Sequence, residues 1–159
     1  MFYTVVYKNL SQNQKLNILN FIKENFPHIE YNNFGMENET IIIVNYENEK
    51  IIGSTCLLNN RCLIDILKNS QINTMNYNVD YNDGLFLYNL CVSIHHRNKK
   101  IASQIIDRTL EMCKKIGINY VHCHAENEIS RNLFLKKGFY ENKVFKIKEN
   151  NYYLMSKFV

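Results

Sequence analysis

The stretch GLFLYNLCVSIHHRNKKIASQII, residues 84–106, decides the fold class. Its first nine residues are mostly apolar or aromatic and predict a strand. The turn HHRNKK follows without an acidic residue, and apolar residues spaced three or four apart then predict a helix. Because the first N–H groups of a helix have no partner within it and face the turn, this unit predicts an anion site, with phosphate the usual occupant. The alternative is a solvated basic loop, since phosphate-binding turns usually contain glycine and this turn has none.

Strand and helix patterns alternate along the rest of the chain. Ser11 and Gln14 resemble a capping box, and the helix behind them is expected to bury Leu16, Leu19, Ile22 and Phe26. Asn127 is expected to cap a helix that ends at Gly138. Strands are expected at residues 4–8, 40–46, 50–58, 119–125, 144–148 and 152–159, with hairpins at the turns ENE and ENN. Residues 59–83 are expected to form one short helix at most and a long loop. The order predicts one α/β domain over residues 1–159.

Composition and charge limit the possible partners. A net charge of +4 mildly favours an anionic partner but does not by itself indicate nucleic acid. The longest apolar run is too short to span a bilayer, so no membrane partner is expected. No basic leader precedes the first strand pattern, so we expect a cytoplasmic protein. The five cysteines form no CxxC pair, and reduced, mostly buried thiols are expected.

Two segments resemble the signatures of the GNAT superfamily of N-acetyltransferases. The acetyl-CoA-binding signature, roughly L-x-V-x-x-x-x-R-G-x-G-x-G/A, is matched by Leu90, Val92, Arg97 and Ala102. Asn98 and Lys100 occupy the two inner glycine positions. The second signature, N-x-x-A-x-x-L-Y-x-x-x-G-F, is matched by NEISRNLFLKKGF, residues 127–139, with Phe134 in place of the tyrosine. If Lys100 has an ordinary right-handed backbone, the missing glycine matters little. If the site needs a positive φ there, the lysine is expected to lower the affinity for CoA.

The resemblance implies a fold and a cosubstrate. The expected fold is a single α/β (α+β) domain with a mixed, mostly antiparallel twisted sheet of six to seven strands and about four helices. In it, strand 84–92 splays from strand 119–125. The implied cosubstrate is acetyl-CoA, with no metal. The residues expected to bind acetyl-CoA are Leu90, Cys91, Val92, Arg97, Asn98, Lys99, Lys100, Ile101, Ala102, Ser103, Asn127 and Phe134.

The implied reaction is direct attack of a neutral amine on the acetyl thioester, which requires a base. Strand 84–92 carries neither carboxylate nor histidine, and its Tyr88 is a candidate for lining the acceptor pocket. His122 and His124 share one face of their strand and are candidates for the base, the alternative being packed residues bonded to backbone. Cys123 points to the opposite face, so no zinc site is expected there. Phe134 cannot protonate the departing thiolate, so water or another residue must do so.

Three functions follow from these residues. The first is an N-acetyltransferase that acts on a primary amine of a small molecule, with an amino sugar phosphate such as glucosamine 6-phosphate as the best single acceptor. The second is a peptide or protein N-acetyltransferase, which would need an open groove. The third is a non-catalytic CoA-binding module, suggested by Lys100, Phe134 and the missing carboxylate. The apolar strand 152–159 is also compatible with a homodimer.

Overall fold

The structure is a computed structural model that describes residues 1–27, 38–59, 84–147 and 149–159. The short helix and loop expected within 60–83 lie outside these residues. The described residues contain three α-helices, where about four were expected. None of the described helices is long and apolar enough to cross a membrane.

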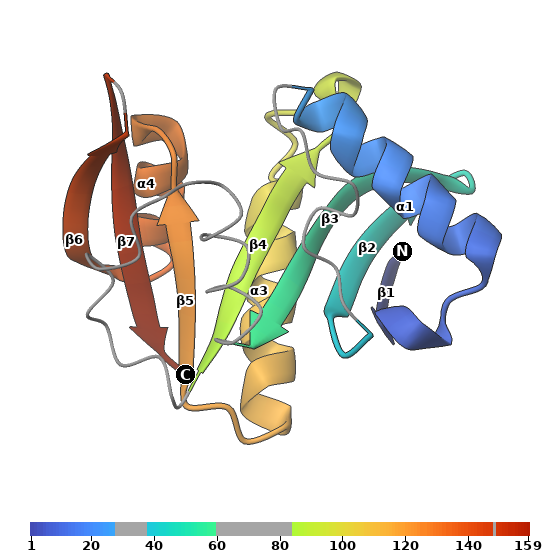
Figure 1. The fold of residues 1–159 in the computed structure, drawn as a ribbon, viewed down its shortest axis with the longest axis horizontal. Helices are drawn as coiled ribbons and strands as arrows, with labels where there is room; N and C mark the ends of the chain where they lie inside the picture. Colours follow the sequence, from blue (N-terminus) through green and yellow to red (C-terminus); the bar gives the residue numbers. More distant parts are fainter. Residues whose placement is uncertain (28–37, 60–83, 148) are drawn as a thin grey trace.

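Seven strands form one sheet, in the order β1-β2-β3-β4-β5-β7-β6 (Figure 1). Only β4 and β5 are parallel, and the other neighbours are antiparallel. The mixed, mostly antiparallel sheet is therefore confirmed. The strands are β1 Phe2–Val6, β2 Ile41–Glu47, β3 Lys50–Asn59, β4 Gly84–Val92, β5 Tyr120–Ala125, β6 Tyr140–Ile147 and β7 Asn150–Phe158.

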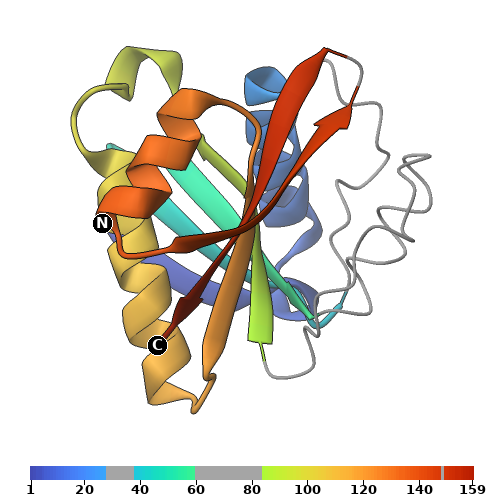
Figure 2. The ribbon, with the colours of Figure 1, turned by 90° about the vertical axis from the view of Figure 1, so that its left-hand side faces the viewer.

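Helices cover both faces of the sheet. Figure 2 shows α3 (Ile101–Lys115) and α4 (Glu128–Lys136) on one face and α1 (Gln12–Asn25) on the other. The α3 face buries the larger cluster, which includes Ile106 and Val121, and the α1 face buries Ile18 and Ile22. Val121, Cys123 and Ala125 alternate with the two histidines of β5 and are fully buried on the α3 side. The two histidines of β5 therefore face the α1 side.

Local signals placed most elements correctly. The capping boxes at Ser11 and Asn127 are both present. Asn48 and Glu49, both with positive φ, form a two-residue turn between β2 and β3, so the first hairpin is confirmed. The buried face of α1 was predicted only in part, because Leu16 is 55% exposed. Ile18 and Phe21 are buried in its place.

A β-bulge interrupts β4 at Asn89, which is buried and has a φ of 51°. The register with β3 shifts there, since Cys91 pairs with Ser54 but Tyr88 pairs with Cys56. The bulge inverts the alternation of β4, so that Leu87 and Leu90, three residues apart, both pack on the α3 side. Cys91 turns to the α1 side. The bulge separates a lower part of β4 that pairs with β5 from an upper part that does not.

Candidate active site

Strands β4 and β5 pair over only four residues each, from Gly84↔Tyr120 to Leu87↔Cys123. Beyond the bulge they diverge, as Figure 1 shows, and the predicted splay is present. A cavity of about 180 Å³ lies at the divergence. Its walls come from β4, the end of β5, α4 and the C-terminal end of α1. The residues that line it are Phe26, Phe86, Leu87, Tyr88, Asn89, Leu90, His124, Glu126, Asn127, Ser130 and Phe134.

The turn between β4 and α3 adopts the backbone conformation of a glycine-rich turn without containing glycine. Asn98 has a φ of 63°, and Lys100, the N-cap of α3, has a φ of 61° and a ψ of 14°. Both are left-handed conformations, which favour glycine and tolerate asparagine better than lysine. Of the two possibilities for Lys100, the structure therefore has the positive φ.

The first turn of α3 is open to an anion. Helices α1 and α4 each begin with a capping box, whereas no side chain caps α3 and no acidic residue lies in its first turn. The N–H groups of Ile101, Ala102 and Ser103 have no acceptor within the helix because they lie in its first turn. Lys99 and Arg97 are exposed beside them. These residues together could hold a diphosphate.

The upper part of β4 offers backbone rather than side chains. Leu90 and Val92 are half-buried against α3. Cys91 is buried with its Sγ atom 3.4 Å from the Ser54 Oγ atom. Burial raises the pKa of the Cys91 thiol to about 12, so it remains protonated at neutral pH. Cys91 can contribute to a cosubstrate site only through its main chain.

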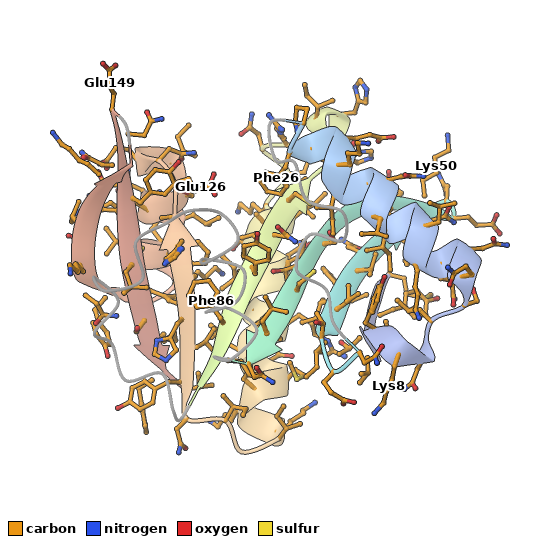
Figure 3. The ribbon with its side chains drawn as sticks, in the orientation of Figure 1. Lys8, Phe26, Lys50, Phe86, Glu126 and Glu149 are labelled. Carbon is orange, nitrogen blue, oxygen red and sulfur yellow. The ribbon has the colours of Figure 1, made fainter. Side chains whose placement is uncertain are left out.

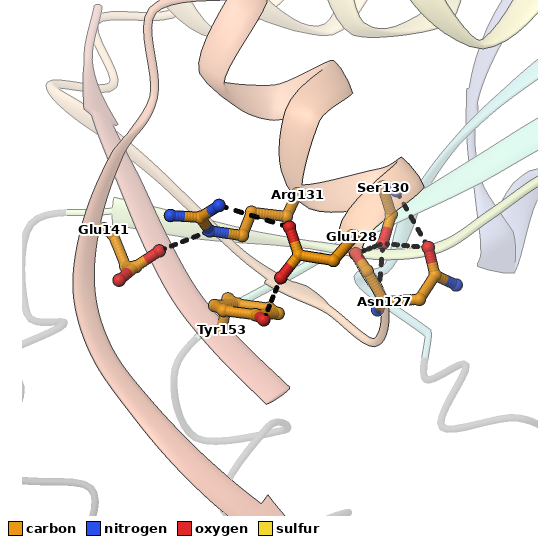
Figure 4. A network of polar contacts seen from close by, with 6 residues as sticks. All are labelled: Asn127, Glu128, Ser130, Arg131, Glu141 and Tyr153. Atoms are coloured by element: carbon orange, nitrogen blue, oxygen red, sulfur yellow. Dashed lines mark hydrogen bonds and ion pairs between the residues drawn. The ribbon is translucent and has the colours of Figure 1, made fainter. Parts of the chain in front are cut away.

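Helix α4 supplies the opposite wall. The Asn127 Oδ1 atom accepts a hydrogen bond from the Ser130 N–H at 2.9 Å, which fixes the start of the helix at the cavity (Figure 4). Phe134 is buried and packs edge-on against Phe139, with ring centroids 5.1 Å apart. Both predicted residues of this wall therefore line the cavity. Phe134 presents an aromatic ring without a hydroxyl at the position of the tyrosine in the second signature.

The two histidines occupy different environments. His124 lines the cavity and contacts the Phe86 ring edge-on, with centroids 4.9 Å apart. His122 does not line it. Its Nδ1 atom lies 2.6 Å from the Ser156 Oγ atom, which also accepts a hydrogen bond from Asn142.

Burial lowers the pKa of His122 and of His124 to about 4. Both rings are neutral at pH 7 and are weak bases, because burial disfavours the charged imidazolium. Of the two, only His124 lies at the cavity. Tyr88, the third predicted catalytic residue, lines the cavity, and its backbone lies opposite Cys56 of the neighbouring strand β3.

Sequence reasoning missed Glu126, a carboxylate at the cavity. It follows the last residue of β5 and precedes the cap of α4. Figure 3 shows it at the tip of β5, with Phe86 between β4 and β5 and Phe26 at the end of α1. Within the described part of the chain, Glu126 is the one carboxylate that lines this cavity. Its position between a strand and an N-cap was the available signal, because such a loop begins at the carboxyl end of the strand, where ligands bind in open α/β sheets.

Basic residues on α4 and just beyond it already bind carboxylates. Arg131 is an ion-pair partner of Glu128 and of Glu141, its Nε atom lying 2.7 Å from Glu141 Oε2 (Figure 4). The Lys137 Nζ atom lies 2.6 Å from the Asp107 Oδ2 atom. These cations therefore belong to surface networks. No group of three His, Cys, Asp or Glu side chains in the described ranges is arranged to hold a metal ion.

The sequence model of the acetyltransferase (GNAT) family matches residues 12–139 of this chain. The chain belongs to the GNAT family. The predicted family, fold and enzyme class, an acyltransferase acting on an amine, are thereby confirmed, and the family uses acetyl-CoA. No curated protein matches the sequence.

Solved structures share the fold of this GNAT protein at low sequence identity. ElaA from Escherichia coli superposes with a TM-score of 0.74 at 16% identity, over 99% of this chain and 98% of that chain. An aminoglycoside 6'-N-acetyltransferase complexed with coenzyme A superposes with a TM-score of 0.72 at 11% identity, over 98% of this chain and 96% of that chain. The ribosomal-protein-S18-alanine N-acetyltransferase from Escherichia coli superposes with a TM-score of 0.68 at 11% identity, over 98% of this chain and 92% of that chain.

Proposed function

We propose that this GNAT protein transfers the acetyl group of acetyl-CoA to a primary amine of a small molecule by direct attack, without a covalent intermediate. The observation that carries the proposal is the divergence of β4 from β5, with a cavity at the divergence and the uncapped first turn of α3 beyond the end of β4. A chain-like ligand with a diphosphate at one end and a thioester at the other fits this path.

The cosubstrate site is proposed as follows. The N–H groups of residues 97–103 hold the diphosphate, and Arg97 and Lys99 add positive charge. The backbone of residues 90–92 pairs with the pantetheine arm as an added strand, since β5 does not occupy that edge. Asn127 and Phe134 lie along the other side of the arm. The site needs no metal ion.

Glu126 is the proposed acceptor of the amine's proton. An amine reaches the protein as an ammonium ion, which a carboxylate at the cavity attracts and deprotonates, directly or through water. The neutral amine nitrogen then attacks the thioester carbon, the C–S bond breaks as the tetrahedral intermediate collapses, and the second proton of the nitrogen passes to the departing thiolate, directly or through water. His124, neutral beside the same cavity, is the second candidate for this step.

We propose an amino sugar phosphate of the glucosamine 6-phosphate type as the acceptor. The net charge of +4 supports an anionic molecule, and Glu126 would receive its ammonium end. Arg131 and Lys137 bind carboxylates within the protein, so the phosphate would be met by other cations. A single domain over 1–159, a cytoplasmic location and a homodimer stay predictions. The edge argument for a dimer no longer applies, because β7 pairs with β5 and β6.

Calorimetric titration with acetyl-CoA, followed by a thiol-release assay on a panel of amines, tests the proposal. The panel contains glucosamine 6-phosphate, glucosamine, an aminoglycoside and a peptide with a free N-terminal alanine. Preference for glucosamine 6-phosphate over glucosamine supports the acceptor. Turnover of the peptide alone would favour a protein N-acetyltransferase. Uptake of acetyl-CoA without turnover of any amine would favour a non-catalytic module.

A further inference from the structure

The β4–α3 turn holds a conformation that its sequence disfavours. Lys100 is left-handed although a lysine side chain gives no local compensation for the contact of its Cβ atom with the following carbonyl oxygen. Such a conformation persists only where the surroundings impose it. The turn that is proposed to bind the diphosphate must therefore be held from outside.

Backbone contacts fix the beginning of the turn. The Ser93 N–H donates to the Ile52 carbonyl at 2.9 Å, and the His96 N–H donates to the Ser93 carbonyl at 2.8 Å. They hold the short 3₁₀ helix Ile94–His96 against β3. They do not reach Asn98 or Lys100, which follow it.

One side-chain contact fixes the end of this 3₁₀ helix. His96 Nε2 lies 2.8 Å from Glu47 Oε2, at the last residue of β2. In the described part of the chain, this is the one side-chain hydrogen bond made by residues 94–100. The His96 side chain is only 20% exposed, so the contact is shielded more than an ordinary surface pair.

The contact spans a hollow rather than a packed interface. A cavity of about 380 Å³ lies between β2 and the turn, lined among others by Glu47, His96, Lys99, Ile101 and Gln104. Because packing is incomplete there, the turn has few apolar contacts to hold its shape. The link from Glu47 to His96 adds a side-chain restraint two residues before Asn98.

We propose that Glu47 is a positioning residue that acts through His96 to keep the glycine-free turn in its diphosphate-binding conformation. The inference rests on the proposed binding of acetyl-CoA at this turn. Loss of the link lowers the fraction of molecules with a competent turn, and the apparent Kd rises by the reciprocal of that fraction. Since a partly shielded hydrogen bond between two side chains contributes little more than a surface pair, we expect Kd to rise about three-fold.

The test measures the Kd of acetyl-CoA by calorimetry for Glu47→Ala, with Glu39→Ala as the matched control. Glu39 forms an exposed ion pair of the same 2.8 Å length with Lys8, on another part of the surface. We expect Glu47→Ala to raise Kd about three-fold, Glu47→Gln to restore most of the affinity and Glu39→Ala to leave it unchanged. The KM of any accepted amine should not move with Glu47→Ala.

A double-mutant cycle with Lys100→Gly separates positioning from general stability. Glycine adopts the left-handed conformation without restraint, so Glu47→Ala should change Kd less in that background. An unchanged Kd in Glu47→Ala, or an equal loss in both backgrounds, would overturn the inference while leaving the proposed function intact. Absence of acetyl-CoA binding by the wild-type protein would instead refute the proposed function, and this inference with it.

Discussion

Replacing Lys100 by glycine is expected to make the protein more stable. Lys100 has a φ of 61°, in a region that costs an L-residue roughly 1–2 kcal/mol. Glycine removes that strain but gives the unfolded chain more freedom, which costs about 0.5–1 kcal/mol. The balance is a gain of about 0.5–1 kcal/mol in the free energy of unfolding. For a chain of this size, the gain corresponds to a rise of roughly 2 °C in Tm.

Urea unfolding followed by circular dichroism measures this difference directly. Lys99→Gly is the matched control, because Lys99 has the same charge and exposure but is not among the residues with positive φ. There the substitution only adds freedom to the unfolded chain, so a loss of about 0.5 kcal/mol is expected. If Lys100→Gly proves no more stable than Lys99→Gly, the left-handed strain argued for the turn does not exist.

Three further outcomes are expected. Lowering the pH from 7 to 5 should reduce the free energy of unfolding by on the order of 2 kcal/mol for each of His122 and His124: their native pKa is about 4, so the unfolded rings bind protons that the native rings do not. The pH dependence of the free energy of unfolding should be weaker in His122→Gln, and an unchanged pH dependence would contradict the burial of His122. Glu126→Gln should lower kcat/KM for the amine about 100-fold without changing the Kd of acetyl-CoA; the distant control Glu111→Gln should do neither, and equal activity of the two variants would exclude Glu126 as the base. Phe134→Tyr should raise kcat about ten-fold if thiolate protonation limits the rate, and an unchanged kcat in single-turnover measurements would show that it does not.

Local patterns in the sequence predicted the elements well, because their causes lie within a few residues. The capping box at Ser11 satisfies helix N–H groups with side chains three residues away. The turn at Asn48 and Glu49 joins two strands that pair in immediate succession. The small apolar face of β5 followed from strict alternation.

Features that depend on distant partners were not predicted. Asn89 is a polar residue within the apolar pattern of β4, and it forms the bulge beyond which β4 no longer pairs with β5. The sequence records the bulge only in the spacing of Leu87 and Leu90, which face the same side of the sheet although they are three residues apart. The insertion of β7 between β5 and β6 is a non-local choice of neighbours that no window of sequence encodes. Glu126 is a site candidate because it lines a cavity formed by residues distant in the sequence, such as Phe26 and Phe86.

The short pairing of β4 with β5 divides the sheet into two blocks that are each continuous in sequence, residues 2–92 and 120–158. A pantetheine arm that paired with the upper part of β4 would extend the hydrogen bonding across this seam. The coenzyme would then link and stabilise the two blocks of the sheet, in addition to donating the acetyl group. Amide hydrogens on both sides of the seam should exchange more slowly once it is in place, including those of β5, which the diphosphate never touches.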